Sequence, residues 1–274
     1  MYRLIATDLD GTLLNAHHQV DPFTIDVLRK LERQGVAIAI ATGRHYSDVA
    51  GIRDVLGVRA HLITSNGARV HDPDDREIFA ENIRPEFVRR LVSHDVADDA
   101  IVNLFLDRDW LIDRDAPELL RYHQDSGFRY AVTDLRAYPG HDVAKVLYIA
   151  EPETLARVET NLEREFADEL YVTYSLADCL EVMSPVVSKG RALQVVLDRL
   201  GITRADCVAF GDNMNDIDML ETAGRPFMMG NSNPDLIARL PHVPRIGNNF
   251  DAAVARQLTQ LFDLENLQDD APVA

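Results

Sequence analysis

Residues 7–14 read Thr-Asp-Leu-Asp-Gly-Thr-Leu-Leu and follow directly on a short apolar run. That run is typical of a strand buried on both faces of a sheet, so Asp8 and Asp10 are expected at the end of a buried strand. A carboxylate in such a place must be paired with a cation, coordinate a metal or take up a proton. Gly11 permits a sharp turn, and Thr12 adds a hydroxyl group there. The stretch therefore predicts a polar site at the end of the first strand. The alternative is a solvated corner that happens to carry two aspartates.

Strands and helices alternate after this stretch. Asp21 and Pro22 have the form of an N-cap and a first helical residue, and Gly35 is placed to end that helix. Buried strands are expected over residues 36–41 and 61–64, and each runs into small or polar residues. Strands that alternate with helices of about 10–15 residues indicate a parallel sheet, which binds its ligands at the carboxyl ends of the strands. We therefore expect an α/β fold with a Rossmann-like core.

The pattern changes after residue 67. A hairpin is expected within residues 68–79, and a mixture of helices and strands follows it. Helices are expected over residues 85–92, 117–123 and 152–166, and strands over residues 100–106, 110–113, 145–150, 170–175 and 179–183. This order predicts an α+β unit inserted into the first domain. We expect a core of residues 1–81 and 184–274 and an inserted cap domain of residues 82–183.

The parallel-sheet pattern then resumes. A helix is expected to begin at Lys189, and a buried strand over residues 207–210 leads into residues 211–216, which read Gly-Asp-Asn-Met-Asn-Asp. Asp212 and Asp216 are therefore expected at the same edge of the sheet as the first two aspartates. The final ten residues look like a frayed acidic tail.

Composition restricts the partners of the chain. It has 274 residues, 46% of them hydrophobic, which is enough for a substantial core. Its formal net charge of −17 argues against general binding to nucleic acids or to anionic membranes. An acidic protein that handles phosphate needs a local positive centre, and a divalent cation can provide it.

Cysteines and histidines give no sign of a metal site in the sequence. Cys179 and Cys207 show no metal-ligand spacing, and the absence of a secretory signal suggests a reducing cytoplasm with inert, buried thiols. No apolar run approaches about 18 residues, so no membrane span is expected. None of the nine histidines has a zinc-ligand spacing, and we expect them on the surface or in loops.

Four short motifs occur in a fixed order along the chain. They are Asp-Leu-Asp-Gly-Thr at residues 8–12, Ala-Thr-Gly-Arg at residues 41–44, Ser-Lys-Gly at residues 188–190 and the stretch at residues 211–216. Together they resemble the haloacid dehalogenase superfamily of phosphohydrolases. More closely, the chain resembles the Cof-type sugar-phosphatase branch, which carries a large α/β cap between the second and third motifs. The resemblance covers nearly the whole chain.

The chemistry of these residues agrees with the resemblance. Hydrolysis of a phosphate monoester is slow in water, and attack by a carboxylate followed by water divides it into two easier steps through an aspartyl-phosphate. Asp8, the first residue after the strand, is the expected nucleophile, and Asp10 is placed to act as general acid and base. The resemblance implies Mg²⁺ bound by the side chains of Asp8 and Asp212 and by the backbone carbonyl of Asp10. Mg²⁺ prefers such oxygen ligands.

Further residues are expected around the phosphate. Lys189 would pair with Asp8 and stabilise the transition state, because the start of a helix is otherwise a poor place for a cation. By resemblance, Thr42 would offer its hydroxyl to the phosphoryl group, and Asn215 and Asp216 would orient metal-bound water or the loop. A solvated lysine and ordinary helix-capping acids are the alternatives.

The neighbouring turns complete the expected phosphate- and substrate-binding set. Its members in these turns are Gly11, Gly43, Arg44 and Asn66. Arg44 would reach the substrate or pair with an acidic residue. Asn66 lines the pocket in the family, and a plain turn is its alternative.

We predict Mg²⁺-dependent hydrolysis of a small phosphorylated metabolite, with a sugar phosphate as the expected class, by a cytoplasmic monomer or homodimer. One alternative is a phosphotransferase or phosphomutase that uses the same residues. Another is a non-catalytic sugar-phosphate-binding regulatory module, which would be expected to have lost Asp8 or Asp10. A P-loop kinase is excluded because the chain has no Gly-x-x-x-x-Gly-Lys run.

Overall fold

The computed structural model describes residues 1–264. Contacts between residues gather in two compact units. Unit 1 consists of residues 1–42, 53–61 and the chain from residue 189 onward, and unit 2 consists of residues 43–52 and 62–188. The predicted acidic tail, residues 265–274, lies outside the described residues. The expected domain boundaries at residues 81 and 183 stay a prediction.

Unit 1 is built on parallel strands. Their order is β13-β12-β1-β2, and they are β1 (Leu4–Thr7), β2 (Ala37–Ala41), β12 (Cys207–Gly211) and β13 (Arg225–Met228). Strand β1 lies between β2 and β12, with Ala6 paired to Ala39 on one side and to Ala209 on the other. All neighbours in this order run parallel. The predicted parallel α/β core is confirmed.

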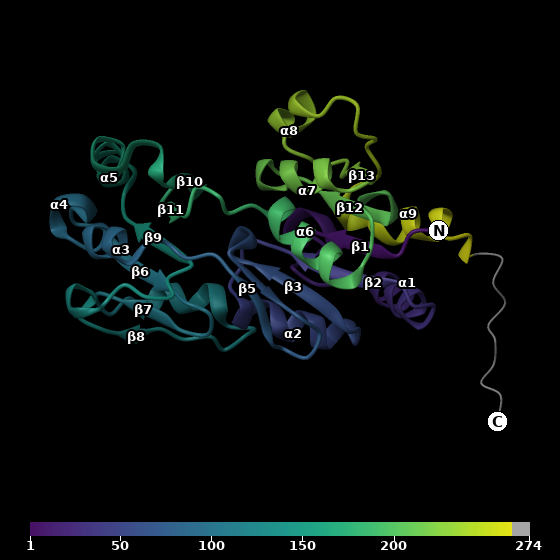
Figure 1. Cartoon of the computed structure of the whole chain (residues 1–274), viewed down its shortest axis with the longest axis horizontal. Coiled ribbons are helices and arrows are strands. Elements are labelled where there is room, and N and C mark those ends of the chain that lie inside the picture. The colour runs from purple at the N-terminus through teal and green to yellow at the C-terminus, as the bar shows by residue number, and fades with distance from the viewer. Residues whose placement is uncertain (265–274) are drawn as a thin grey trace. The chain divides into compact units, whose positions relative to one another are not determined.

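Helices cover this sheet. They are α1 (Pro22–Arg33), α6 (Lys189–Leu200), α7 (Ile217–Thr222), α8 (Pro234–Arg239) and α9 (Ala253–Leu261). The predicted start of α1 is confirmed, because the Asp21 side chain accepts the N–H of Phe23. Helices α6 and α7 pack against each other, and α7 also packs on β12 and β13 (Figure 1). This pair of helices therefore begins beside the carboxyl ends of the central strands.

Unit 2 contains a six-stranded sheet of order β10-β11-β9-β6-β7-β8. Its strands are β6 (Ile101–Phe105), β7 (Trp110–Ile112), β8 (Ala131–Val132), β9 (Lys145–Ile149), β10 (Tyr171–Leu176) and β11 (Cys179–Met183). Neighbouring strands are antiparallel except β7 and β8. The helices are α3 (Pro85–Leu91), α4 (His94–Ala97) and α5 (Pro152–Phe166), and their apolar residues share one core with alternate residues of β6, β9 and β11. The predicted α+β character is confirmed.

The opposite side of this sheet carries an aromatic cluster. Phe105, Trp110 and Phe128 are buried together, and the ring of His45 stacks on Phe128 at 4.3 Å between centroids. Trp110 Nε1 donates a 2.8 Å hydrogen bond to the buried Asn103 Oδ1. A polar partner thus satisfies the indole N–H inside an apolar cluster.

The predicted hairpin is also present in unit 2. It is formed by β4 (Arg69–His71) and β5 (Glu77–Ala80), and β4 pairs with β3 (Ala60–Thr64) in antiparallel fashion. Helix α2 (Tyr46–Leu56) precedes β3, and both elements have residues in each unit.

One sequence-based expectation is wrong. His61 and His71 are buried within strands β3 and β4, with 5% and 0% of their surface exposed, although histidines were expected on the surface or in loops. His45 is also buried, in the loop before α2. The helix expected over residues 117–123 is present as a 3₁₀ helix. The short elements α4, α8 and β8 were not predicted. Both cysteines are buried as expected, and burial raises the pKa of each thiol to about 12. Within residues 1–264, no helix is long and apolar enough to span a membrane.

Candidate active site

Lys189 is the centre of a buried cluster of charges in unit 1. It is the first residue of α6, and its Nζ lies 2.6 Å from Asp8 Oδ1 and 2.6 Å from Asp216 Oδ1. All three side chains are buried. A cation is unfavourable at a helix N-terminus, and the two carboxylates offset that cost. The structure therefore brings together the first, third and fourth motifs.

Asp216 fixes the loop after β12. Its Oδ1 is held by Lys189, and its Oδ2 accepts the backbone N–H groups of Asp212 (2.9 Å) and Asn213 (3.0 Å). Together with the Asn213 side chain it forms a capping box. The helix-cap alternative for Asp216 is thus correct in its geometry, and the same side chain also pairs with Lys189. Both oxygens are committed, so Asp216 positions its neighbours.

The first turn of the chain approaches the same loop closely. Thr12 Oγ1 donates a 2.7 Å hydrogen bond to Asp212 Oδ1. Gly11 has φ +80°, and a Cβ there would lie 2.3 Å from Asp212 Oδ2. Asn231 Nδ2 also donates to the Gly11 carbonyl at 2.8 Å. A side chain at position 11 would displace the Asp212 carboxylate, so glycine is required for this approach.

The electrostatics of the cluster suit a cation. Burial and the charge of Asp216 raise the pKa of Asp8 more than Lys189 lowers it, and burial raises the pKa of Asp212 to about 6. Burial alone would lower the pKa of Lys189, but Asp216 and Asp8 raise it overall, so Lys189 stays charged. Three carboxylates within 4.8 Å of one another share this one ammonium group, which leaves an excess of negative charge.

The donor set fits a hard divalent ion. Among the described residues, Asp8 Oδ2 has no hydrogen-bond partner, and Asp212 is partly exposed. Two carboxylates with room for water and substrate oxygens are the usual protein contribution to a Mg²⁺ site. Asp216, with both oxygens occupied, would not bind the ion directly but would hold Lys189 and the loop that carries Asp212 in position.

Of the remaining predicted residues of unit 1, Asp10 and Asn215 are exposed to a larger extent and Thr42 is buried. The Asp10 side chain is 42% exposed and lies 3.3 Å from His18 Nδ1. Asn215 is exposed on the loop that Asp216 fixes, and Thr42 is buried at the end of β2. Thr42 therefore shares the carboxyl edge of the sheet with Asp8 at the end of β1.

Three predicted residues belong to unit 2. The Ser65 N–H donates to the Arg44 carbonyl (2.9 Å), and Asn66 has φ 57° in the following turn. A Cβ on Gly43 would lie 3.0 Å from Asn66 Oδ1. The structure thus brings Gly43, Arg44 and Asn66 to one pair of turns.

These turns contact a buried ion pair that was missed from the sequence. Lys145 Nζ lies 2.9 Å from Glu181 Oε1 and donates to the Gly43 carbonyl at 3.4 Å, while Asn66 Nδ2 donates to Glu181 Oε2 at 3.4 Å. The sequence feature that could have indicated this pair is the single charged residue in each of the apolar strands β9 and β11. No sequence feature indicated that Asn231 contacts Gly11.

The comparisons with known proteins agree with the motifs. Residues 5–258 match the family model of haloacid dehalogenase-like hydrolases. A relative from Cronobacter sakazakii named HMP-PP phosphatase is 43% identical over 268 residues, which are 97% of this chain and 98% of that protein. A relative from an Enterobacter species with the same name is 40% identical with the same coverage. A crystal structure of a Thermotoga maritima protein is 27% identical, with a TM-score of 0.85 over 99% of both chains.

Proposed function

Because this chain belongs to the haloacid dehalogenase-like hydrolases and is a phosphatase, we propose that it hydrolyses a small phosphorylated metabolite in two steps through a phosphoryl group carried by Asp8. One observation carries the proposal. The buried Asp8 carboxylate lies 2.6 Å from the Lys189 ammonium group, in a cluster with Asp212 that has excess negative charge. A carboxylate held in this way is oriented for attack and has only one oxygen occupied.

In the first step a carboxylate oxygen of Asp8 attacks phosphorus, and the bond from phosphorus to the leaving oxygen breaks. Asp10 donates a proton to that oxygen as it leaves. Its side chain is 42% exposed, which agrees with a group that must reach a substrate atom. Lys189 holds Asp8 in place, and the Thr42 hydroxyl donates to the phosphoryl oxygens.

In the second step water attacks the phosphorus of the aspartyl-phosphate. Asp10, now a carboxylate, takes the proton of that water, and the bond between phosphorus and Asp8 breaks. Inorganic phosphate leaves, and both aspartates return to their starting states. Lys189 and the loop fixed by Asp216 keep the regenerated Asp8 carboxylate in position.

We propose that Mg²⁺ is the cofactor, bound by Asp8, Asp212 and the Asp10 carbonyl. When bound, Mg²⁺ would screen the repulsion between the carboxylate and the phosphate and stabilise charge on the transferring group. Asn215 and Asp216 would hold the surrounding loop.

The substrate is proposed from the relatives. HMP-PP, which their name gives as the substrate, is the first to test, because two relatives share 40–43% identity over nearly the full length. A sugar phosphate, the class implied by the motif resemblance, is the second. We propose that residues 82–183 form the cap domain that selects between these two substrates. Gly11, Gly43, Arg44 and Asn66 are proposed to bind the substrate or its phosphate.

An assay of phosphate release tests the function. The full chain with Mg²⁺ is incubated with HMP-PP or with a panel of sugar phosphates, without an acceptor sugar. Asp8→Asn should lower kcat by about 10⁴-fold or more, and Asp26→Asn, an exposed position on α1, should leave it unchanged. Near-normal Mg²⁺-dependent turnover by Asp8→Asn would contradict the mechanism. No phosphate release in this assay, together with phosphorylation of an acceptor sugar when one is added, would identify a phosphotransferase.

A further inference from the structure

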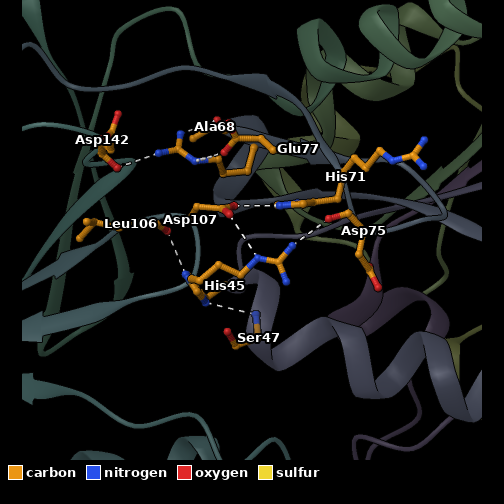
Figure 2. A network of polar contacts seen from close by, with 12 residues as sticks. His45, Ser47, Ala68, His71, Asp75, Glu77, Leu106, Asp107 and Asp142 are labelled. Carbon is orange, nitrogen blue, oxygen red and sulfur yellow. Dashed lines mark hydrogen bonds and ion pairs between the residues drawn. The ribbon is translucent and has the colours of Figure 1, made fainter.

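Unit 2 contains a second group of side chains with the composition of a metal site, and none of its members belongs to the phosphatase motifs. His71 lies on β4, Glu77 on β5, and Asp107 in the turn between β6 and β7. One ligand atom from each lies within 4.8 Å of the others. His71 and Glu77 are paired in the β4–β5 register, so they point to one face of the hairpin. Figure 2 shows Asp107 pointing toward His71.

His71 is the observation that distinguishes this group from an ordinary acidic surface. Its side chain is 0% exposed, and among the described residues neither ring nitrogen makes a hydrogen bond. His71 Nε2 lies 2.8 Å from Asp107 Oδ1, and that contact lacks hydrogen-bond geometry. Buried polar atoms are rarely left in this state.

Two arginines orient the carboxylates. Arg108 Nε donates to Asp107 Oδ2 at 3.2 Å, which leaves Oδ1 facing His71. Arg69 Nε lies 3.2 Å from Glu77 Oε2, while its terminal nitrogens donate to other oxygen atoms. Groups that hold the second oxygen of a carboxylate in this way are typical of the outer shell of metal sites.

The arginines also determine which class of ion fits. Each of the two carboxylates already has an arginine beside it, so a hard cation such as Mg²⁺ or Ca²⁺, which binds through charge, gains little here. An imidazole nitrogen instead favours a transition metal.

We propose that His71, Glu77 and Asp107 bind a divalent transition-metal ion of the Zn²⁺ class. The ion would join the β6–β7 turn to the β4–β5 hairpin. It would be a second metal site, separate in sequence and chemistry from the Mg²⁺ site at Asp8 and Asp212.

Zinc binding by the full chain tests the proposal. Metal-free protein is dialysed against Zn²⁺ in excess Mg²⁺, and bound zinc per chain is measured together with the affinity by calorimetry. Glu77→Gln and Asp107→Asn should each lose one equivalent or bind it about tenfold or more weakly. Asp109→Asn, an exposed carboxylate in the same turn, should bind zinc like the wild type.

The same series is repeated with Asp212→Asn in each chain, so that the difference cannot come from the phosphatase site. X-ray absorption of the zinc-loaded Asp212→Asn protein should show one imidazole ligand, which Asp107→Asn loses together with the zinc. Equal zinc binding by Asp107→Asn and Asp109→Asn, or a bound zinc without imidazole, would overturn the proposal. An absence of bound zinc in every chain would also overturn it and would leave a simple His71–Asp107 ion pair.

Discussion

The two carboxylate clusters of this molecule differ in how their charge is balanced. In unit 1, Asp8, Asp212 and Asp216 share the single ammonium group of Lys189, and burial raises the pKa of Asp212 to about 6. In unit 2, each carboxylate has an arginine beside it. Burial would raise the pKa of Asp107 there, but contacts with His71 and Arg108 outweigh burial and lower it to about 2. Buried carboxylates with too little positive charge indicate a site that accepts a hard cation and an anionic substrate, whereas carboxylates that each have an arginine beside them gain little from such a cation.

Removing the shared cation should have the largest effect. Lys189→Met leaves Asp8 and Asp216 buried without their partner, which we expect to lower the free energy of unfolding by about 3–5 kcal/mol and to abolish phosphatase activity. Urea unfolding without divalent ions measures the first effect. Lys30→Met on α1 is the control. A Lys189→Met protein as stable as the wild type would mean that the cluster carries little net charge.

A substitution at Gly11 tests whether activity requires the close approach of this turn to the Asp212 carboxylate. Gly11→Ala places a methyl group against Asp212 and strains a residue with φ +80°, so we expect kcat to fall about 10²-fold. Gly35 has the similar φ of +83° but no atom within 4 Å of its Cβ position. Gly35→Ala should therefore cost about 1 kcal/mol of stability and leave kcat unchanged. If both variants lost activity equally, strain rather than contact with Asp212 would be responsible.

His45 should make unit 2 sensitive to acid. Burial lowers its pKa to about 4, although the hydrogen bond from Nε2 to the Leu106 carbonyl raises it, and Nδ1 of the neutral ring accepts the Ser47 N–H. The unfolded chain, with a histidine pKa near 6.5, binds this proton first. Stability is therefore undiminished above about pH 6.5 and falls as the pH drops toward 4, and the loss amounts to about 2 kcal/mol at pH 5.

Urea unfolding of His45→Gln against pH measures this effect. Glutamine can keep both hydrogen bonds but does not titrate, so its stability should depend less on pH between 4 and 6.5. If the unfolding free energies of the two proteins changed with pH in the same way, protonation of His45 would not destabilise the fold.

Arg108 should give the smallest effect. Its side chain is 47% exposed and lies over the Tyr46 ring, so Arg108→Met should lower the free energy of unfolding by less than about 1 kcal/mol. Thermal and urea unfolding of Arg108→Met measures this loss, which is then compared with the loss of unfolding free energy in Lys189→Met. A cost as large as that of Lys189 would show that unit 2 depends on its charges as strongly as unit 1.

Much of the fold could be predicted because its signals are local. Asp21 and Pro22 indicate the start of α1 through their own side chains, independently of the tertiary structure around them. Asp8, Thr42 and Asp212 follow buried strands, and the carboxyl ends of neighbouring parallel strands necessarily meet at one edge. The approach of Asp8 to the loop after β12 therefore follows from strand order alone.

The rest depends on register and packing that short patterns do not determine. His71 meets Asp107 only because a hairpin and a distant turn are aligned in one way, and a shift of one residue would turn His71 to the other face. The pairing of Lys145 with Glu181 depends in the same way on the register of two strands. Residues 117–123 have helical composition, but composition does not separate a 3₁₀ helix from an α-helix.

The central position of β1 has a consequence for the nascent chain during synthesis. Leu4 pairs with Ala37 and also with Cys207, so one side of β1 must wait until most of the polypeptide has left the ribosome. Until then an apolar strand with unpaired backbone groups is open to other chains. Premature termination anywhere before residue 207 would leave that strand permanently open, so such fragments should depend on chaperones or aggregate.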